Sequence, residues 1–233
     1  MVEKGGRSLM RIYRLNRAVF SIKNNAAQFL NGLTANTLDQ PRNAFLDVHG
    51  KIIATFDQIR FSDDHFLIIL EKPFRETLLN HIERFLRLGK VILQEEDYEV
   101  YFDLDGQYPL EREDFAVPQK KGRLILTRRN LPDTIFDREF TLFRLKNTLP
   151  LHGVDYHNVF LLNVSEEEFV SFTKGCFLGQ EPVAKVHNRS QPSWKLVVRY
   201  EDECSQDQKT MMTSKTTDPQ TKRVLGFVFV SNH

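Results

Sequence analysis

The chain has 233 residues, 41% of them hydrophobic, so it can bury a substantial core in one or two domains. Its formal net charge of +1 excludes a strong positive field for nucleic acid and leaves room only for a local basic patch. The two cysteines, Cys176 and Cys204, make no disulfide framework or zinc-ligand spacing and favour a reducing compartment. The first seven residues lack the apolar core of a signal peptide, and every apolar run is too short to span a bilayer. We therefore expect a cytoplasmic protein that binds neither a membrane nor nucleic acid directly.

The hydrophobic pattern predicts short strands joined by tight turns, with few helices. Strands are expected at residues 11–15, 19–22, 44–48, 51–61, 66–70, 91–93, 98–104, 123–127, 196–200 and 224–230. Helices are expected at residues 26–31, 73–89 and 140–146. The polar stretches 105–121 and 201–222 are predicted to be loops. Hairpins that alternate with a few helices, without regular βαβ units, indicate an α+β fold.

The most unusual stretch covers residues 174–181 and reads KGCFLGQE. A predicted helix begins near Gly179, and its N-terminus, together with the nearby Lys174, would lower the pKa of the Cys176 thiol. A thiol with a lowered pKa is a stronger nucleophile and metal ligand at neutral pH, because the thiolate is the reactive form. The pattern thus suggests a reactive cysteine.

The same stretch carries groups that suit a ligand. Gly175 and Gly179 allow backbone conformations that bring N–H groups close to a bound molecule. Gln180 and Glu181 place an amide and a carboxylate at a helix start, where they can match the donors and acceptors of a heterocycle. A simpler interpretation makes Cys176 a small buried hydrophobe in a glycine turn. Chemistry alone favours this second interpretation, because free cysteines are among the most buried residues.

The eight residues resemble the KGC[YF]xGQE signature of the folate-binding YgfZ-like family, which is related in fold to the glycine-cleavage T-protein. Further segments are similar to that family, so the resemblance runs nearly from end to end. They are AQFLNGLT at 27–34, HGKII at 49–53, LPLHGVD at 149–155, and TS at 213–214 followed by VLGF at 224–227.

The resemblance implies an α+β fold of antiparallel sheets with packed helices. Residues 1–190 would form a folate-binding body of two intertwined subdomains around a central cavity. Residues 191–233 would form a reduced β-barrel-like part.

The resemblance also implies a function. The cofactor would be tetrahydrofolate or a one-carbon derivative, and the partners would be iron–sulfur client or assembly proteins whose clusters this protein helps to build or repair. The reactive residues would be Cys176 and Lys174. The cofactor would contact Gly175, Gly179, Gln180 and Glu181.

Two departures from the related T-protein keep alternatives open. Ala54 and Thr55 stand where the T-protein has an acidic residue that assists aminomethyl transfer, and the side chain of the nearby Asp57 faces the same way only in one strand register. Lys146 stands where the family often has a glutamate, and an ammonium offers no acceptor to the N–H groups of a pterin. One alternative is an aminomethyltransferase that acts on a lipoyl-bound substrate, which the shared fold would suggest and the missing acid at Ala54 and Thr55 speaks against. The other is an interaction module that binds no folate, which Lys146 and the shortened C-terminal part suggest.

The remaining residues of interest have plain structural interpretations. His152 beside a glycine is expected at the surface, Trp194 in the core, and Cys204 in a polar loop without a role. The acidic run at residues 166–168 is expected to be a solvated face.

Overall fold

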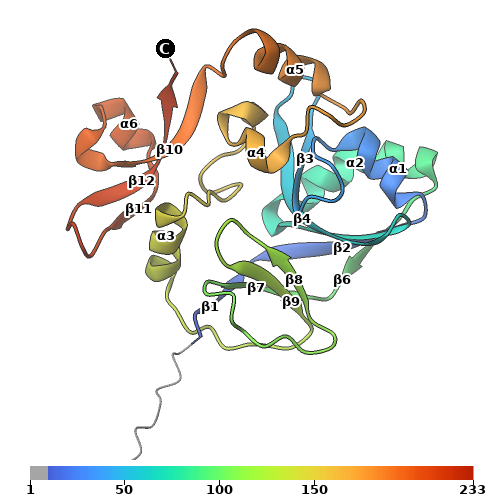
Figure 1. Cartoon of the computed structure of the whole chain (residues 1–233), viewed down its shortest axis with the longest axis horizontal. Coiled ribbons are helices and arrows are strands. Elements are labelled where there is room, and N and C mark those ends of the chain that lie inside the picture. Colours follow the sequence, from blue (N-terminus) through green and yellow to red (C-terminus); the bar gives the residue numbers. More distant parts are fainter. Residues whose placement is uncertain (1–9, 233) are drawn as a thin grey trace, which may run out of the picture.

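The computed structural model describes residues 10–232, which form three antiparallel sheets with six α-helices packed around them (Figure 1). The five-stranded sheet has the order β3 (Arg42–Leu46), β4 (Ile52–Ser62), β5 (His65–Glu71), β2 (Arg17–Lys23), β6 (Ile92–Glu96). The four-stranded sheet has the order β1 (Ile12–Leu15), β7 (Glu99–Asp103), β9 (Arg123–Thr127), β8 (Phe115–Pro118). The C-terminal sheet has the order β10 (Trp194–Tyr200), β12 (Val224–Ser231), β11 (Thr213–Thr217).

The helices are short except for the second. They are α1 (Ala26–Leu33), α2 (Arg75–Gly89), α3 (Asp137–Lys146), α4 (Glu166–Phe169), α5 (Gln180–Arg189) and α6 (Gln206–Met211). A short 3-10 helix, the turn Lys72–Phe74, leads from β5 into α2. Every helix within residues 10–232 is too short or too polar to cross a bilayer.

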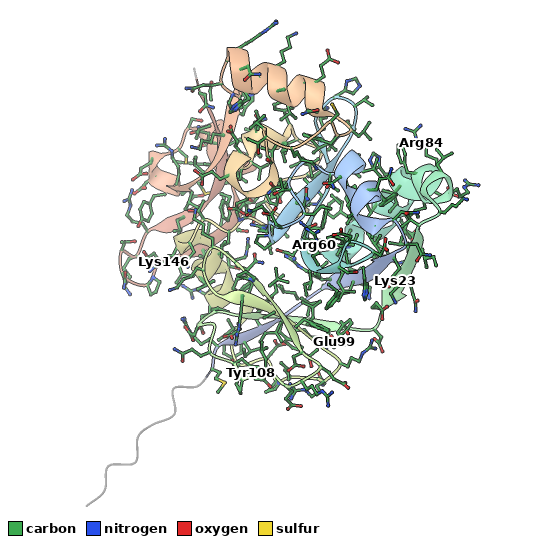
Figure 2. The ribbon with its side chains drawn as sticks, turned by 45° about the vertical axis from the view of Figure 1, so that its right-hand side comes forward. Lys23, Arg60, Arg84, Glu99, Tyr108 and Lys146 are labelled. Atoms are coloured by element: carbon green, nitrogen blue, oxygen red, sulfur yellow. The ribbon has the colours of Figure 1, made fainter. Side chains whose placement is uncertain are left out.

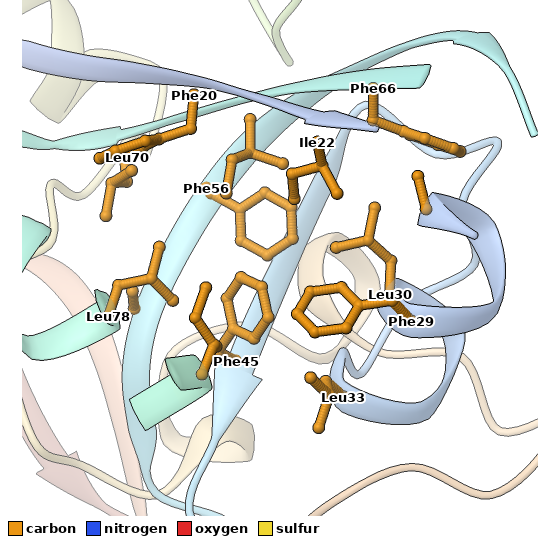
Figure 3. Close-up of a cluster of buried hydrophobic side chains, with 14 of the residues drawn as sticks. Phe20, Ile22, Phe29, Leu30, Leu33, Phe45, Phe56, Phe66, Leu70 and Leu78 are labelled. Atoms are coloured by element: carbon orange, nitrogen blue, oxygen red, sulfur yellow. The ribbon is translucent and has the colours of Figure 1, made fainter. Parts of the chain in front are cut away.

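The first core lies between the five-stranded sheet and the two helices α1 and α2 (Figure 3). Strand β4 sends Ala54 and Phe56 into this core. Because neighbouring side chains of a strand point to opposite faces, Thr55 and Asp57 must point to the other face of the sheet. Asp57 therefore lies on the same side of the sheet as Thr55, away from α1 and α2.

The other face of the five-stranded sheet packs partly on the four-stranded sheet. Val19 and Ile69 meet Val100 and Phe102 in a second core, which Phe140 of α3 closes. Each of these side chains is almost fully buried. The two sheets and α3 are thus held together by apolar contact.

The C-terminal strands pack against the body and form an open three-stranded sheet, where a barrel-like part was expected. Leu196, Leu225 and Phe227 share a core with Leu161 and Val183 of the body. The described residues therefore contain mixed α and β structure with antiparallel sheets, as predicted, and an open C-terminal sheet. The division of the chain at residue 190 stays a prediction.

Most predicted elements are confirmed, and the errors lie in the polar stretches. Helix α2 and the hairpin of β4 and β5 occur where the pattern placed them. The two predicted loops were wrong, since one contains β8 and the other contains α6 and β11. These three elements are only four to six residues long, and their residues are mostly polar or half-exposed, so apolar periodicity could not reveal them.

Candidate functional site: an anchored cysteine loop beside a charged cleft

Lys174 anchors the start of the KGCFLGQE segment, which we call the cysteine loop, residues 174–181. Its ammonium Nζ donates to the carbonyl oxygens of Thr34 at 2.6 Å and Asn36 at 2.9 Å, just beyond the end of α1. The same Nζ lies 5.3 Å from the centre of the Phe177 ring. Burial lowers the pKa of Lys174 to about 8. The lysine is thus used to hold the loop on the body.

Gly179 anchors the other end of the cysteine loop. Its φ of +82° is a conformation that favours glycine, and a Cβ at this position would lie 2.3 Å from the carbonyl oxygen of Asp47. The neighbouring Leu178 donates its N–H to the carbonyl of Gly32 at 3.0 Å. Only glycine therefore allows α5 to begin so close to the turn between β3 and β4.

Cys176 lies between the two anchors with its thiol exposed and free. The interpretation of Cys176 as a small buried hydrophobe is therefore wrong. Gly175 next to it has open space where a Cβ would stand, so it makes no close backbone approach of the kind seen at Gly179. Within the described residues, no hydrogen bond joins Lys174 to Cys176, because the ammonium points inward and the thiol outward.

Gln180 and Glu181 form the first turn of α5, where Gln180 is half-buried and Glu181 is exposed. Neither side chain lines the clefts described below, and the same holds for Lys174, Gly175 and Gly179. The six predicted site residues, Lys174, Gly175, Cys176, Gly179, Gln180 and Glu181, thus lie together on the cysteine loop and outside these clefts. Their roles toward a cofactor stay a prediction.

A buried charged cluster surrounds Asp57 of β4, which is 1% exposed. One nitrogen of the Arg17 guanidinium pairs with Asp57, and the other lies 2.8 Å from Glu71 Oε1. Burial raises the pKa of Glu71, although Arg17 opposes this. Charged side chains in the middle of apolar strands are a signal for such a cluster, because a buried charge needs a partner.

Arg42 extends the cluster toward solvent. Its Nε lies 3.5 Å from Asp57 Oδ1, and its Nη1 pairs with Glu168. Gln119 also donates to Asp57 Oδ1, at 2.7 Å. The expectation of a fully solvated acidic run was wrong for Glu168, whose side chain is 20% exposed and ion-paired.

Two adjoining clefts open over this cluster, with volumes of about 350 and 490 Å³. Both are lined by Lys120, Glu167 and Glu168. Arg42 and Gln119 line the smaller cleft, and Thr148, Pro150, Gln191 and Lys195 belong to the larger one. We call the two together the central cleft.

Asn36 connects the cysteine loop to the central cleft. Its carbonyl accepts from Lys174, and its side-chain amide donates to the carbonyls of Arg42 at 3.0 Å and Glu168 at 3.2 Å. Two hydrogen-bonded steps therefore join the anchor of the thiol loop to the wall of the cleft.

Lys146 lies at the end of α3, toward the C-terminal sheet (Figure 2). Its Nζ lies 3.2 Å from Asp218 Oδ1 and 3.4 Å from Gln220 Oε1, and its side chain is 38% exposed. It is absent from the residues that line the central cleft. Its charge is thus neutralised outside that cleft.

The stretch 149–155 has an important residue that the sequence did not single out. Asp155 is buried and accepts hydrogen bonds from Leu151 N at 2.8 Å and Arg144 Nη1 at 2.6 Å. It also accepts from the hydroxyls of Thr213 at 2.8 Å and Ser214 at 2.5 Å. This carboxylate therefore fastens the C-terminal sheet to α3.

Two of the plain structural interpretations were wrong. His152 is buried, with 3% exposed, because it stacks between Phe74 and Tyr156. Trp194 is 47% exposed, since β10 begins beyond the core. Cys204 lies in a loop as predicted, between the 3-10 helix Glu201–Glu203 and α6, and is buried beside Met212 and Val228. Among residues 10–232, no group of three or more His, Cys, Asp or Glu side chains is placed to hold a metal ion.

The fold has a solved counterpart. The glycine cleavage system aminomethyltransferase T from Bartonella henselae superposes with a TM-score of 0.68 and 13% sequence identity, over 97% of this chain and 79% of that one. The chain has an aminomethyltransferase T fold. At this identity the likeness establishes the fold alone.

Similarity to known sequences is weaker than this structural likeness. No family model matches the chain. An uncharacterized protein of Haemophilus influenzae is 24% identical over 153 residues, which make up 63% of this chain and 55% of that protein. The match thus spans about half the length of that relative.

Proposed function

We propose that the protein binds a folate in its central cleft and assists iron–sulfur cluster assembly or repair in client enzymes, with Cys176 as the reactive group. The observation that carries the proposal is the exposed Cys176 thiol on a loop anchored at both ends. The resemblance of this loop to the YgfZ-like signature and the aminomethyltransferase T fold support it.

Thiol chemistry suits this role. A thiolate is a good ligand for iron and a good acceptor of sulfur, but clusters are usually held by four thiolates. Cys204 is buried in the C-terminal sheet and cannot complete a cluster site with Cys176. Cys176 would therefore hold a cluster only together with thiols of the client or assembly protein.

The central cleft has groups that fit a folate. Glu167 and Glu168 offer carboxylate acceptors to the N–H donors of a pterin, and Lys120 and Lys195 offer cations to a glutamate tail. The buried Arg42 Nε has no well-directed hydrogen bond in the structure, so a donor remains at the inner wall. The bound folate would supply a one-carbon unit or a reduced pterin, while the chain binds and orients it.

The position of Lys146 removes an objection to folate. Its ammonium is engaged by Asp218 outside the cleft, so it does not oppose the pterin donors from the cleft wall. Lys146 is therefore no longer a reason to regard the chain as an interaction module that binds no folate.

Two experiments test folate binding and the role of the Cys176 thiol separately. Titration of the purified protein with tetrahydrofolate, followed by calorimetry, should give saturable binding that weakens when Glu168 is changed to Gln. Absence of saturable heat at millimolar ligand would contradict the folate half.

The thiol half is tested in a deletion strain by the activity of iron–sulfur enzymes. Wild type and the matched control Cys204→Ala should restore activity, and Cys176→Ala should not. Full rescue by Cys176→Ala would contradict a role of the thiol.

A second candidate, aminomethyl transfer, is favoured by the aminomethyltransferase T fold and by Asp57, a carboxylate on the face that Thr55 shares. Both carboxylate oxygens of Asp57 are already engaged, one by Arg17 and the other by Gln119, which leaves it poorly suited to accept a proton. The test is formation of methylene-tetrahydrofolate from glycine with the other glycine-cleavage components supplied. Product formation that Asp57→Asn abolishes would support this candidate over the first.

A further inference from the structure

A separate cleft of about 470 Å³ lies between the 3-10 turn Lys72–Phe74, helix α3 and residues 151–154. It shares no lining residue with the central cleft or the cysteine loop. We call it the His152 cleft, and the residues that matter for its chemistry are Tyr13, Glu71, Phe74, Phe140, Arg144 and His152. Its volume is in the range of roughly 300–1,000 Å³ that is usual for small-molecule sites.

Three buried polar side chains of this cleft have unfilled hydrogen-bonding capacity. Both ring nitrogens of His152 and the Nε of Arg144 lack a partner among the described residues. Glu71 Oε1 lies 2.8 Å from Arg17 Nη2, a good ion-pair distance, but accepts no well-directed hydrogen bond. A buried polar group without a partner destabilises the fold, so a site that leaves several of them together is suited to a ligand that fills them.

The rings around His152 restrict how a ligand can approach. Phe74 stacks on one side of the imidazole at 3.6 Å between ring centres, and Tyr156 lies on the other at 5.3 Å. The flat faces are thus covered, and only the ring edge with its two nitrogens is left for polar contact. Tyr13 and Phe140 stack on each other at 4.1 Å and supply an apolar wall, which suits a flat ring.

The charges at the buried end of the cleft, those of Arg144 and Glu71, are already neutralised. Arg144 pairs with the buried Asp155 at 2.6 Å, and Glu71 pairs with Arg17. Burial, with a smaller contribution from His157, lowers the pKa of His152 to about 3, so its imidazole is neutral near pH 7 and offers one donor and one acceptor. A charged ligand would find no free counter-charge at the buried end of the cleft.

We propose that the His152 cleft binds a small, uncharged, planar heterocycle that carries an amide N–H next to a C=O, with the edge of His152 and Nε of Arg144 as its hydrogen-bonding partners. Both ring nitrogens are buried, so entry requires Phe74, which is only half-buried, to turn away from the face of the imidazole that it covers. The ring of the ligand then lies along the wall of Tyr13 and Phe140.

The proposal is tested with uracil and hypoxanthine as probes on the whole chain. Addition of either probe should shift the ¹⁵N resonances of His152 saturably, and these resonances are assigned by their loss in His152→Phe. That variant keeps the stacked ring but removes both nitrogens, so its affinity for the probe should fall at least about tenfold, or about 1.4 kcal/mol. In wild type, 1,3-dimethyluracil keeps the shape of uracil without its N–H donors and should bind at least about tenfold more weakly.

The outcomes that overturn the proposal are distinct from those that test the folate. No His152 shift with either probe at millimolar concentration would mean that water alone meets the imidazole. Equal affinity of uracil and dimethyluracil, or unchanged affinity in His152→Phe, would mean apolar binding without the proposed edge. Tetrahydrofolate titrated into His152→Phe should bind as in wild type, since the central cleft contains none of these residues.

Discussion

The stretch 149–155 and the cysteine loop carry similar sequence signals, glycines beside polar residues, but the structure uses them in opposite ways. The first stretch buries Asp155 under four hydrogen bonds and buries His152 between two rings. The second is fastened at Lys174 and Gly179 and leaves Cys176 in solvent. The first stretch thus holds the molecule together, whereas the second displays a functional group.

The largest effect should come from Asp155→Ala. The change leaves the buried Arg144 without its counter-charge, and we expect the free energy of unfolding to fall by about 3–5 kcal/mol. Urea denaturation measures it. Lys146→Ala, which breaks the half-exposed pair with Asp218, is the control and should cost under about 1 kcal/mol. Equal losses in the two variants would show that Asp155 does not fasten the C-terminal sheet.

Acid should destabilise the protein through His152. Its pKa is lowered from 6.5 to about 3 in the fold, so below pH 6.5 the unfolded chain binds a proton that the folded chain refuses. Stability should therefore be full above pH 6.5 and fall as the pH drops toward 3, by up to about 1.4 kcal/mol per pH unit.

The measurement is urea denaturation of wild type and His152→Phe at several pH values. Burial also lowers the pKa of His65 and His81, so both proteins should lose some stability in acid, and the difference between them isolates His152. Parallel pH profiles would contradict a buried neutral imidazole.

Within the cysteine loop, Gly179→Ala and Gly175→Ala form a matched pair. The first places a Cβ against the Asp47 carbonyl at a φ of +82° and should cost about 1–3 kcal/mol. The second adds a methyl group in open space and should change stability by no more than about 0.5 kcal/mol. Thermal unfolding distinguishes them, and an equal response would mean that the loop is not anchored at Gly179.

The smallest effect on stability should come from Cys176→Ala, within about 0.5 kcal/mol of wild type, because the thiol is exposed. Its effect on thiol chemistry should be complete. An aromatic disulfide reagent should modify one cysteine of the folded wild type rapidly, the same one in Cys204→Ala, and none in Cys176→Ala until the chain unfolds. Rapid modification of Cys204 in the folded protein would contradict its burial and the difference in exposure between the two cysteines.

The elements with strong apolar patterns, and the segment that carries the thiol, could be predicted from the sequence alone. Helix α2 and the hairpin of β4 and β5 follow from periodicity and turn residues, which act over a few neighbours along the chain. The short elements β8, α6 and β11 do not, because their residues are mostly polar or half-exposed and show no clear apolar period.

Tertiary structure alone decided which groups are buried and which are displayed. The face of Asp57 depended on the strand register, the burial of His152 on the rings of Phe74 and Tyr156, and the outward thiol of Cys176 on carbonyls some 140 residues earlier in the chain. The contact of His152 with Phe74 and the anchoring of Lys174 join segments far apart in sequence, and local patterns of apolar and polar residues carry no information about such contacts. The sequence therefore pointed to the cysteine loop, and the fold showed how that loop is anchored and how it is joined to the central cleft.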